Sequence, residues 1–231
     1  MKLPDGPLLM PVRKLYRSAD QLYRRGLLAA SMRAFRRQPP GTLPSRRLLR
    51  ALRKGWGNEV WSASEELLIG LMREAWKTPG PVLECGSGLS TLLLGVIGMR
   101  AGWEVWTLEH DAFWAEHVRQ ALRRFEITNV HLLHAPLRDY GAFHWYDVPS
   151  EKLPARFSLV LCDGPPGNTP GGRYGLLPVL GHRLSPSVVI LLDDAGRPDE
   201  RAIADRWTAE LGGTMTIEGV QKPYARIEGP G

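Results

Sequence analysis

Acidic side chains recur in this sequence at the ends of short apolar runs, and one of them precedes a glycine-rich turn. Glu84 lies in the first run, directly before the turn Cys85-Gly86-Ser87-Gly88. The others close later runs: Glu109 the second, Asp163 the fourth, and Asp193 with Asp194 the fifth. Open α/β folds bind ligands where the carboxyl ends of parallel strands meet. The pattern therefore predicts a pocket lined with carboxylates, suited to a ligand that carries cationic groups and free hydroxyls.

Alternating runs predict the sheet that positions these carboxylates. Strands are expected at 82–85, 104–108, 129–133, 157–162 and 187–192, and helices at 89–100, 111–125, 175–184 and 198–211. This alternation is typical of a Rossmann-like, doubly wound α/β fold with a mainly parallel sheet. Residues 214–220 and 224–228 predict an antiparallel C-terminal edge hairpin, which we include in a sheet of seven strands.

The segment before the sheet reads as a helical extension. Residues 12–37 have a helical pattern that Pro39-Pro40-Gly41 ends, and Ser45 caps a second helix that ends near Gly55. Ser62 and Glu65 have the spacing of a capping box for a third helix. We therefore expect a helical N-terminal extension over 1–60 and an α/β domain over 61–231.

Charge separates the same two regions. The 231 residues carry a net charge of +6, but residues 1–60 hold 14 Lys and Arg against 3 Asp and Glu. Residues 61–231 hold 16 against 21. No apolar run approaches the roughly 20 residues of a membrane span, and the N-terminus lacks a signal-peptide pattern. Both cysteines, Cys85 and Cys162, lie in apolar runs, so we expect a cytoplasmic protein without a disulfide framework.

The glycine turn is compatible with two classes of ligand. A dinucleotide site would have its third glycine at position 91, where Thr91 stands, and a pyrophosphate does not favour a nearby carboxylate such as Glu84. S-adenosylmethionine fits better, because it carries a sulfonium, an ammonium and a ribose diol but no phosphate. A third interpretation is structural: the glycines let a helix pack closely on a strand.

Several segments together resemble the class I S-adenosylmethionine-dependent methyltransferases, most closely bacterial small-molecule enzymes with a DGPPG segment. They read ECGSGLST from Glu84, VWTLEHD to Asp111, HAPL from His134, LVLCDGPPG from Leu159 and LLDDAG from Leu191. The resemblance covers 61–231. It implies a cofactor site whose glycine-turn side holds the methionine part, with Glu109 on the ribose hydroxyls and the strand ends beside the adenine. The residues implied are Glu84, Gly86, Ser87, Gly88, Ser90, Glu109, His110, Ala135, Pro136, Leu137 and Asp163. His134-Ala135-Pro136 departs from the family, which often has an acidic residue there.

Methyl transfer from a sulfonium is an in-line displacement that needs a positioned and often deprotonated acceptor. We expect Asp163 and Asp193 to act in catalysis, with His144 as a further candidate base. Asp163, Asp193 and Asp194 are also candidate ligands for Mg²⁺, as in metal-dependent O-methyltransferases, which the site resembles. The alternative is that these aspartates cap local turns and the following helix.

The acceptor is expected to be a hydroxyl of a small molecule, a sugar or a natural product. Gly167 follows Pro165-Pro166 where enzymes that methylate flipped bases have an aromatic residue, and Cys162 is poorly placed as a nucleophile. The insertion 139–156 and the loop with Arg173 and Tyr174 are expected to wall the acceptor pocket. For the basic extension, packing over the active site or across a homodimer competes with binding of nucleic acid or an anionic membrane.

Overall fold

The computed structural model describes residues 10–58 and 62–231. Its contacts divide the chain into two compact units, Met1–Gln38 with Pro44–Ser62 and Pro39–Leu43 with Ala63–Gly231. Among the described residues, no helix is both long enough and apolar enough to cross a bilayer.

The first unit is a pair of helices, α1 (Met10–Arg37) and α2 (Arg46–Trp56). Ser45 caps α2 as expected, since its side chain accepts a hydrogen bond from the Leu48 N–H. The helix ends at Trp56, near Gly55 as expected, and the glycine that caps it is Gly57, whose φ of +84° suits glycine. Gly55 itself lies inside α2. A Cβ at this position would come within 2.6 Å of the backbone nitrogen of Leu28 on α1, which explains why the residue is a glycine.

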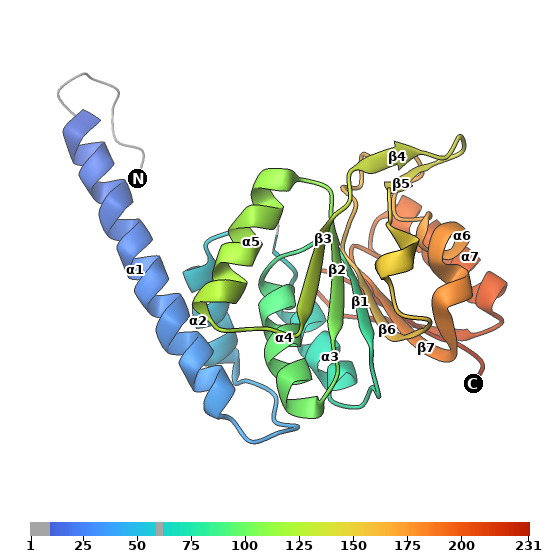
Figure 1. Cartoon of the computed structure of the whole chain (residues 1–231), viewed down its shortest axis with the longest axis horizontal. Coiled ribbons are helices and arrows are strands. Elements are labelled where there is room, and N and C mark those ends of the chain that lie inside the picture. Colours follow the sequence, from blue (N-terminus) through green and yellow to red (C-terminus); the bar gives the residue numbers. More distant parts are fainter. Residues whose placement is uncertain (1–9, 59–61) are drawn as a thin grey trace. The chain divides into compact units, whose positions relative to one another are not determined.

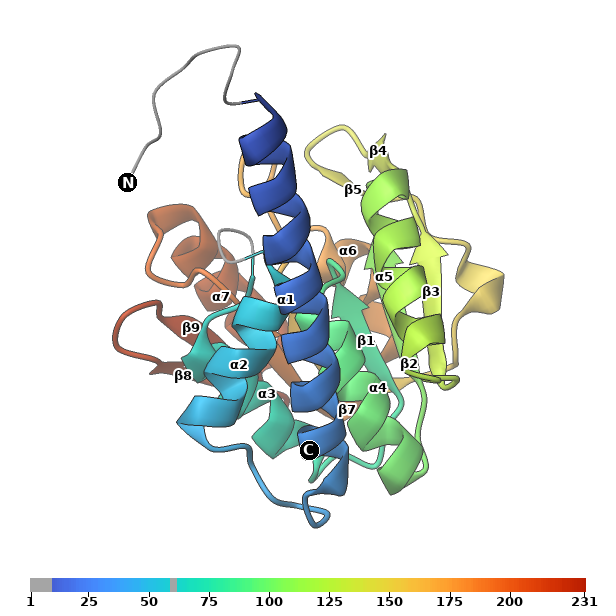
Figure 2. The ribbon, with the colours of Figure 1, turned by 90° about the vertical axis from the view of Figure 1, so that its left-hand side faces the viewer.

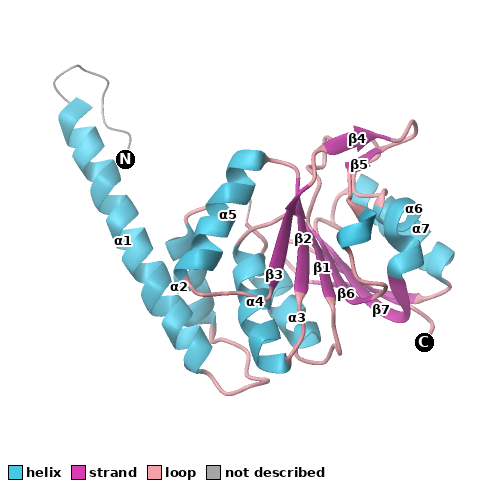
Figure 3. Ribbon diagram, in the orientation of Figure 1, coloured by secondary structure: helices cyan, strands magenta, loops and turns pink. Residues whose placement is uncertain are grey.

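The second unit is built on a seven-stranded sheet in the order β3-β2-β1-β6-β7-β9-β8. Figures 1 and 3 show its strands from β3 to β7 in this order. Its strands are β1 (Val82–Cys85), β2 (Val105–Glu109), β3 (Val130–His134), β6 (Phe157–Cys162), β7 (Leu184–Leu192), β8 (Thr214–Glu218) and β9 (Tyr224–Glu228). The first five in this order pair in parallel, and β9 pairs antiparallel with β7 and β8. Figure 2 shows the β8–β9 hairpin at one edge and β3 at the other. The predicted fold class is confirmed.

Helices cover both faces of the sheet, as Figure 3 shows. One face carries α3 (Glu65–Ala75), α4 (Leu89–Ala101) and α5 (Ala112–Arg124), and the other α6 (Leu176–Leu180) and α7 (Pro198–Leu211). Burial on both faces explains why every residue of β1 is buried and why the central strands read as continuous apolar runs.

Two predicted helix limits were wrong. Ser64, not Ser62, caps α3, because its side chain lies 3.0 Å from the Leu67 N–H, whereas the Ser62 hydroxyl bonds to the Asn58 carbonyl. The helix expected over 175–184 is only α6 followed by a 3-10 turn at Gly181–Arg183, because β7 begins at Leu184.

The insertion after β3 forms a small hairpin of its own, β4 (Leu137–Asp139) with β5 (His144–Tyr146), followed by a 3-10 turn at Ser150–Lys152. Trp145 and Tyr146 of β5 are fully buried in the core that lies against α6 and α7. The insertion is therefore anchored above the carboxyl ends of the strands.

Candidate functional site

The glycine turn after β1 lies directly against the end of β6. The carbonyl of Cys85 accepts hydrogen bonds from the backbone N–H groups of Asp163 (3.0 Å) and Gly164 (2.8 Å). Gly86 has a φ of +88°, and a Cβ there would lie 3.1 Å from the Gly164 nitrogen. A Cβ on Gly88, in contrast, would meet no atom within 4 Å, so the chain leaves open space over this end of the turn.

Glu84 is fully buried beneath this turn. Its Oε2 accepts hydrogen bonds from the hydroxyls of Thr91 (2.7 Å) and Thr107 (2.9 Å), while its Oε1 is buried without a hydrogen-bond partner among the described residues. The Thr91 hydroxyl also accepts the Gly88 N–H at 2.9 Å and so links the turn to the carboxylate. Burial raises the pKa of Glu84 to about 7, although hydrogen bonds oppose the rise. A buried carboxylate oxygen without a partner favours a cationic ligand.

Glu109, at the end of β2, holds the other side of the turn. Its Oε2 accepts the backbone N–H of Ser87 at 3.0 Å and the Ser87 hydroxyl at 2.7 Å, and its Oε1 accepts the Asp111 N–H at 3.0 Å. His110 Nδ1 lies 3.1 Å from Oε1 without the alignment of a hydrogen bond. Burial alone would raise the pKa of Glu109, but these donors outweigh it and lower the pKa. Glu109 is therefore an ionised acceptor held in a fixed orientation.

The residues expected to border the adenine come from adjacent strand ends. Ala135 is buried, and its N–H bonds to the Glu109 carbonyl at 2.8 Å. His134 Nε2 lies 3.2 Å from the His110 carbonyl, so the ends of β2 and β3 are joined at two points. Pro136 is exposed, and Leu137 begins β4. The structure thus brings His110 and Ala135 beside Glu109, and Pro136 and Leu137 follow along the chain.

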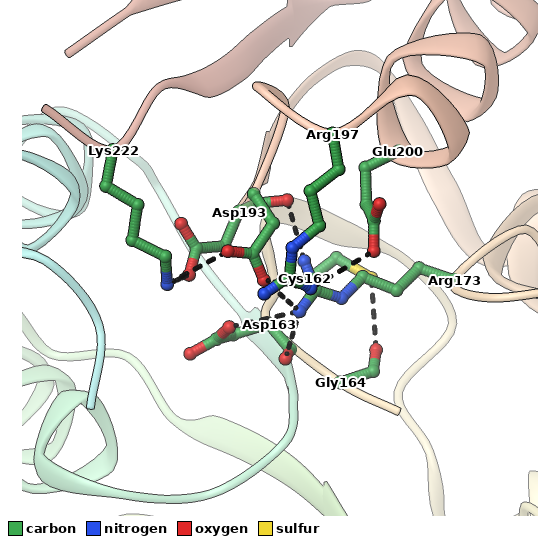
Figure 4. A network of polar contacts seen from close by, with 9 residues as sticks. Cys162, Asp163, Gly164, Arg173, Asp193, Arg197, Glu200 and Lys222 are labelled. Carbon is green, nitrogen blue, oxygen red and sulfur yellow. Dashed lines mark hydrogen bonds and ion pairs between the residues drawn. The ribbon is translucent and has the colours of Figure 1, made fainter. Parts of the chain in front are cut away.

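The predicted metal ligands Asp163, Asp193 and Asp194 come together, with one carboxylate oxygen of each within 4.8 Å of the others. Figure 4 shows that cations of the chain itself already contact them. Arg173 Nη2 lies 2.9 Å from Asp194 Oδ2 and 3.4 Å from Asp163 Oδ1. Lys222 Nζ pairs with Asp193 Oδ2 and lies 3.2 Å from Asp194 Oδ1. The oxygens suit a divalent ion by type, but the chain supplies their counter-charges.

The two cations differ in how firmly they are held. Arg173 is buried and also donates to the carbonyls of Asp193 (2.6 Å) and Asp163 (2.9 Å), so it fastens the ends of β6 and β7 together. Lys222 comes from the β8–β9 turn and its side chain is 38% exposed. Burial alone would lower the pKa of Lys222, but the neighbouring aspartates raise it above its usual value, so the ammonium stays charged at neutral pH.

The surroundings shift the pKa values of Asp163 and Asp194 in opposite directions. Burial and the charge of Asp193 raise the pKa of Asp163 well above its usual value. Burial would also raise the pKa of Asp194, but the charges of Arg173 and Lys222 lower it. Asp194 has a φ of +61°, an uncommon conformation at a strand end. The cluster therefore holds one carboxyl that gains a proton easily beside one that stays ionised.

His144, the third predicted catalytic residue, lies on the β4–β5 hairpin. Its Nε2 is 3.6 Å from Oδ1 of Asp139, its cross-strand neighbour, and its backbone N–H bonds to the Pro170 carbonyl. These contacts keep the imidazole on its own hairpin and do not join it to the acidic cluster. The neighbouring Tyr146 is fully buried, and its hydroxyl has no partner among the described residues.

Sequence reasoning missed three parts of this site. Thr91 was recognised only as a departure from a glycine pattern, although its hydroxyl joins Gly88 to Glu84. Arg173 was assigned only to the wall of the acceptor pocket. Lys222 gave no signal, because a lysine before a proline in a hairpin turn does not indicate where its ammonium will lie.

Comparisons with known proteins agree with this geometry at the level of the fold. No family model matches the chain, and a search of the curated proteins found no match. Among solved structures, the chain is similar to a putative caffeoyl-CoA O-methyltransferase from Staphylococcus aureus. The two sequences are 13% identical, the match covers 90% of this chain and 100% of the other, and the TM-score is 0.59. It is also similar to an S-adenosylhomocysteine-bound methyltransferase of Podospora anserina (18% identity, 100% and 99% covered, TM-score 0.51).

A third similar structure is a Thermus thermophilus 16S rRNA N2 G1207 methyltransferase in complex with S-adenosylmethionine and guanosine. The two sequences are 19% identical, and the TM-score is 0.52. The match covers 74% of this chain and 44% of the other. The chain has the fold of the class I S-adenosylmethionine-dependent methyltransferases. Because one of these neighbours is named for a small acyl thioester and another for ribosomal RNA, the fold alone leaves the acceptor open.

Proposed function

We propose that this protein is an S-adenosylmethionine-dependent methyltransferase that transfers a methyl group to a hydroxyl of a small molecule. The observation that carries the proposal is the pair of buried carboxylates on either side of the glycine turn. Glu84 has an oxygen without a partner, and Glu109 is ionised and held by the Ser87 backbone. A ligand that brings an ammonium and a ribose diol would satisfy both, whereas a pyrophosphate would be repelled.

The cofactor site then follows from the arrangement of the strand ends. Glu84, Gly86, Ser87, Gly88 and Ser90 would hold the methionine part, with Asp163 on its other side. Glu109 would accept from the ribose hydroxyls, and His110 with the 135–137 segment would border the adenine. Three hydrogen bonds hold the Glu109 carboxylate and His110 Nδ1 lies 3.1 Å from it, so the Ser87 hydroxyl would turn aside when the ribose binds.

The transfer would be a direct displacement. A lone pair of the acceptor oxygen forms the new bond to the methyl carbon, the carbon–sulfur electron pair returns to sulfur, and S-adenosylhomocysteine leaves. The acceptor proton passes to the pair Asp163 and Asp193, because burial and the charge of Asp193 raise the pKa of Asp163 and make this carboxylate a stronger base than a free aspartate. We assign this role to the pair and not to His144, whose contacts lead to Asp139.

A hydroxyl acceptor of modest size is supported by the anchored insertion. Phe143 stacks on Tyr140, with ring centroids 5.3 Å apart, and meets Tyr174 edge to face at 5.5 Å. Such aromatic groups suit sugars and ring systems. Gly167 is exposed after Pro165-Pro166, so no aromatic side chain stands there to stack on a flipped base.

A second candidate function concerns the helical unit. Of its residues 19–58, ten are Lys or Arg, nine of them Arg, against the single acidic residue Asp20. Arg46, Arg50 and Lys54 are exposed and recur every four residues along α2. Arginines bind phosphates through two parallel hydrogen bonds, so we propose that this unit binds RNA.

Two experiments test these proposals on the full chain. Calorimetric titration with S-adenosylmethionine, S-adenosylhomocysteine and NAD⁺ should give micromolar binding of the first two and none of the third, and binding of NAD⁺ alone would refute the methyltransferase. Methyl-labelled cofactor, incubated with hydroxylated sugars and phenols or with RNA, then reveals the acceptor class.

For the helical unit, the logarithm of the affinity for labelled RNA should fall linearly with log salt. Arg46→Gln, Arg50→Gln and Lys54→Gln together should weaken the binding and reduce this slope more than Arg201→Gln with Arg206→Gln does. Equal losses in the two variants would contradict RNA binding by α2. Binding to anionic vesicles but not to RNA would assign the surface to a membrane instead.

A further inference from the structure

The acidic cluster at the ends of β6 and β7 has an accessible side and a closed side. Figure 4 shows Arg173 and Lys222 approaching the aspartates from opposite directions. Arg173 contacts Oδ2 of Asp194 and the backbone below it, whereas Lys222 contacts Oδ1 of Asp194 and Oδ2 of Asp193. Arg197 Nη1 adds a third cation, 3.1 Å from Asp194 Oδ2 at the rim.

Cations of the chain therefore contact all three aspartates, and among their carboxylate oxygens the described residues leave only Oδ1 of Asp193 buried without a hydrogen-bond partner. A divalent ion such as Mg²⁺ needs close carboxylate or water oxygens in octahedral geometry. Asp163, Asp193 and Asp194 are the residues that would hold such an ion, but Oδ2 of Asp193 and Oδ1 of Asp194 instead hold the Lys222 ammonium. An ion that entered would have to displace the ammonium and share the carboxylates with buried Arg173.

We infer that the Lys222 ammonium takes the place that a divalent ion would occupy at Asp163, Asp193 and Asp194, and that it positions the acceptor oxygen. This inference rests on the proposed methyltransferase function. An ammonium has three N–H donors, and its contacts with Asp193 and Asp194 engage two of them. The third donor serves the acceptor, because Lys222 is part exposed and the aspartates that it contacts form one cluster with Asp163, which adjoins the glycine turn.

The positive charge of Lys222 would assist the reaction at the acceptor oxygen. An acceptor oxygen that loses its proton becomes negative, and a fixed ammonium stabilises that charge without a metal. Arg173 does not serve this purpose, because its guanidinium is buried and its donors point to the carbonyls of Asp163 and Asp193. Arg173 therefore stabilises the structure, and Lys222 is the cation that faces the acceptor.

The test is a titration with MnCl₂, followed through the electron paramagnetic resonance signal of free Mn²⁺. The wild-type chain and Lys222→Arg should show no saturable binding below about 1 mM. Lys222→Gln should bind one Mn²⁺ at least tenfold more tightly, and adding Asp193→Asn should abolish the gain. Lys77→Gln, which removes an exposed lysine outside the cluster, should behave like the wild type.

Either of two results would overturn the inference: Mn²⁺ binding to the wild type as tight as to Lys222→Gln, or none to Lys222→Gln when its melting temperature shows that it is folded. Titration with S-adenosylhomocysteine separates this inference from the proposed function. Lys222→Gln should bind it as the wild type does, because the lysine lies on the acceptor side. Failure of both proteins to bind it would refute the methyltransferase and leave the Mn²⁺ comparison interpretable.

Discussion

Compared with the wild type, Glu84→Gln should become more stable as the pH rises, although it removes a residue of the proposed cofactor site. Glu84 is fully buried, and its pKa is raised from 4.5 to about 7. Between these two values the unfolded chain has lost a proton that the folded protein keeps, so this group makes the wild type less stable as pH rises. Glutamine does not titrate and removes that dependence.

The size of the effect follows from the shift. A pKa raised from 4.5 to about 7 corresponds to about 3 kcal/mol once Glu84 is ionised in both states. From pH 5 to pH 8, the free energy of unfolding of Glu84→Gln minus that of the wild type should therefore increase by about 2–3 kcal/mol. The new amide nitrogen takes the unpartnered position at a cost of about 1–3 kcal/mol, but that cost does not vary with pH.

Urea unfolding at several pH values measures this difference directly. Glu151→Gln, an exposed glutamate in the 3-10 turn, is the control and should give a flat difference. A flat difference for Glu84→Gln would refute the reasoning, because it would mean that burial does not raise this pKa. In the same pH range, cofactor affinity of the wild type should increase with pH, since the ammonium pairs with ionised Glu84.

Three further predictions concern the framework of the site. Arg173→Met should lower the free energy of unfolding by about 3–5 kcal/mol, because it leaves the buried aspartates without their cation, whereas Arg201→Met on the exposed face of α7 should change it by less than about 0.5 kcal/mol. Gly86→Ala should cost about 1–2 kcal/mol or more in urea unfolding, because its φ is +88° and a Cβ would lie 3.1 Å from Gly164; an unchanged midpoint would contradict this. Thr91→Val should cost about 1–3 kcal/mol and loosen the turn, measured as faster amide exchange at Gly88; unchanged exchange would show that the hydroxyl link is unimportant.

The strands and most of their ends could be predicted because a doubly covered parallel sheet leaves a strong sequence signal. Val82–Cys85 and Phe157–Cys162 were located to the residue, since continuous apolar runs bounded by Gly, Pro or acidic residues have few other interpretations. Helix limits were harder. Gly55 reads as a helix end, but the close approach to Leu28 explains why a glycine stands inside α2.

The carboxylates of the site could be located from the sequence, but their counter-charges could not. Asp163, Asp193 and Asp194 follow predicted strands, so their proximity follows from the order of the sheet. Lys222 reaches them from a hairpin turn about 30 residues later, through an antiparallel pairing whose register no local pattern specifies. A metal was therefore the natural expectation from the carboxylates alone.

The affinity for S-adenosylhomocysteine, compared between the wild type, Glu109→Ala and Glu116→Ala, tests the central claim most directly. Glu116 is an exposed glutamate on α5 and serves as the matched control. Calorimetry should give micromolar binding to the wild type and Glu116→Ala, weakened tenfold or more by Glu109→Ala, about 1.4 kcal/mol or above. No binding to the wild type, or equal binding to all three, would contradict a cofactor site between the glycine turn and the end of β2.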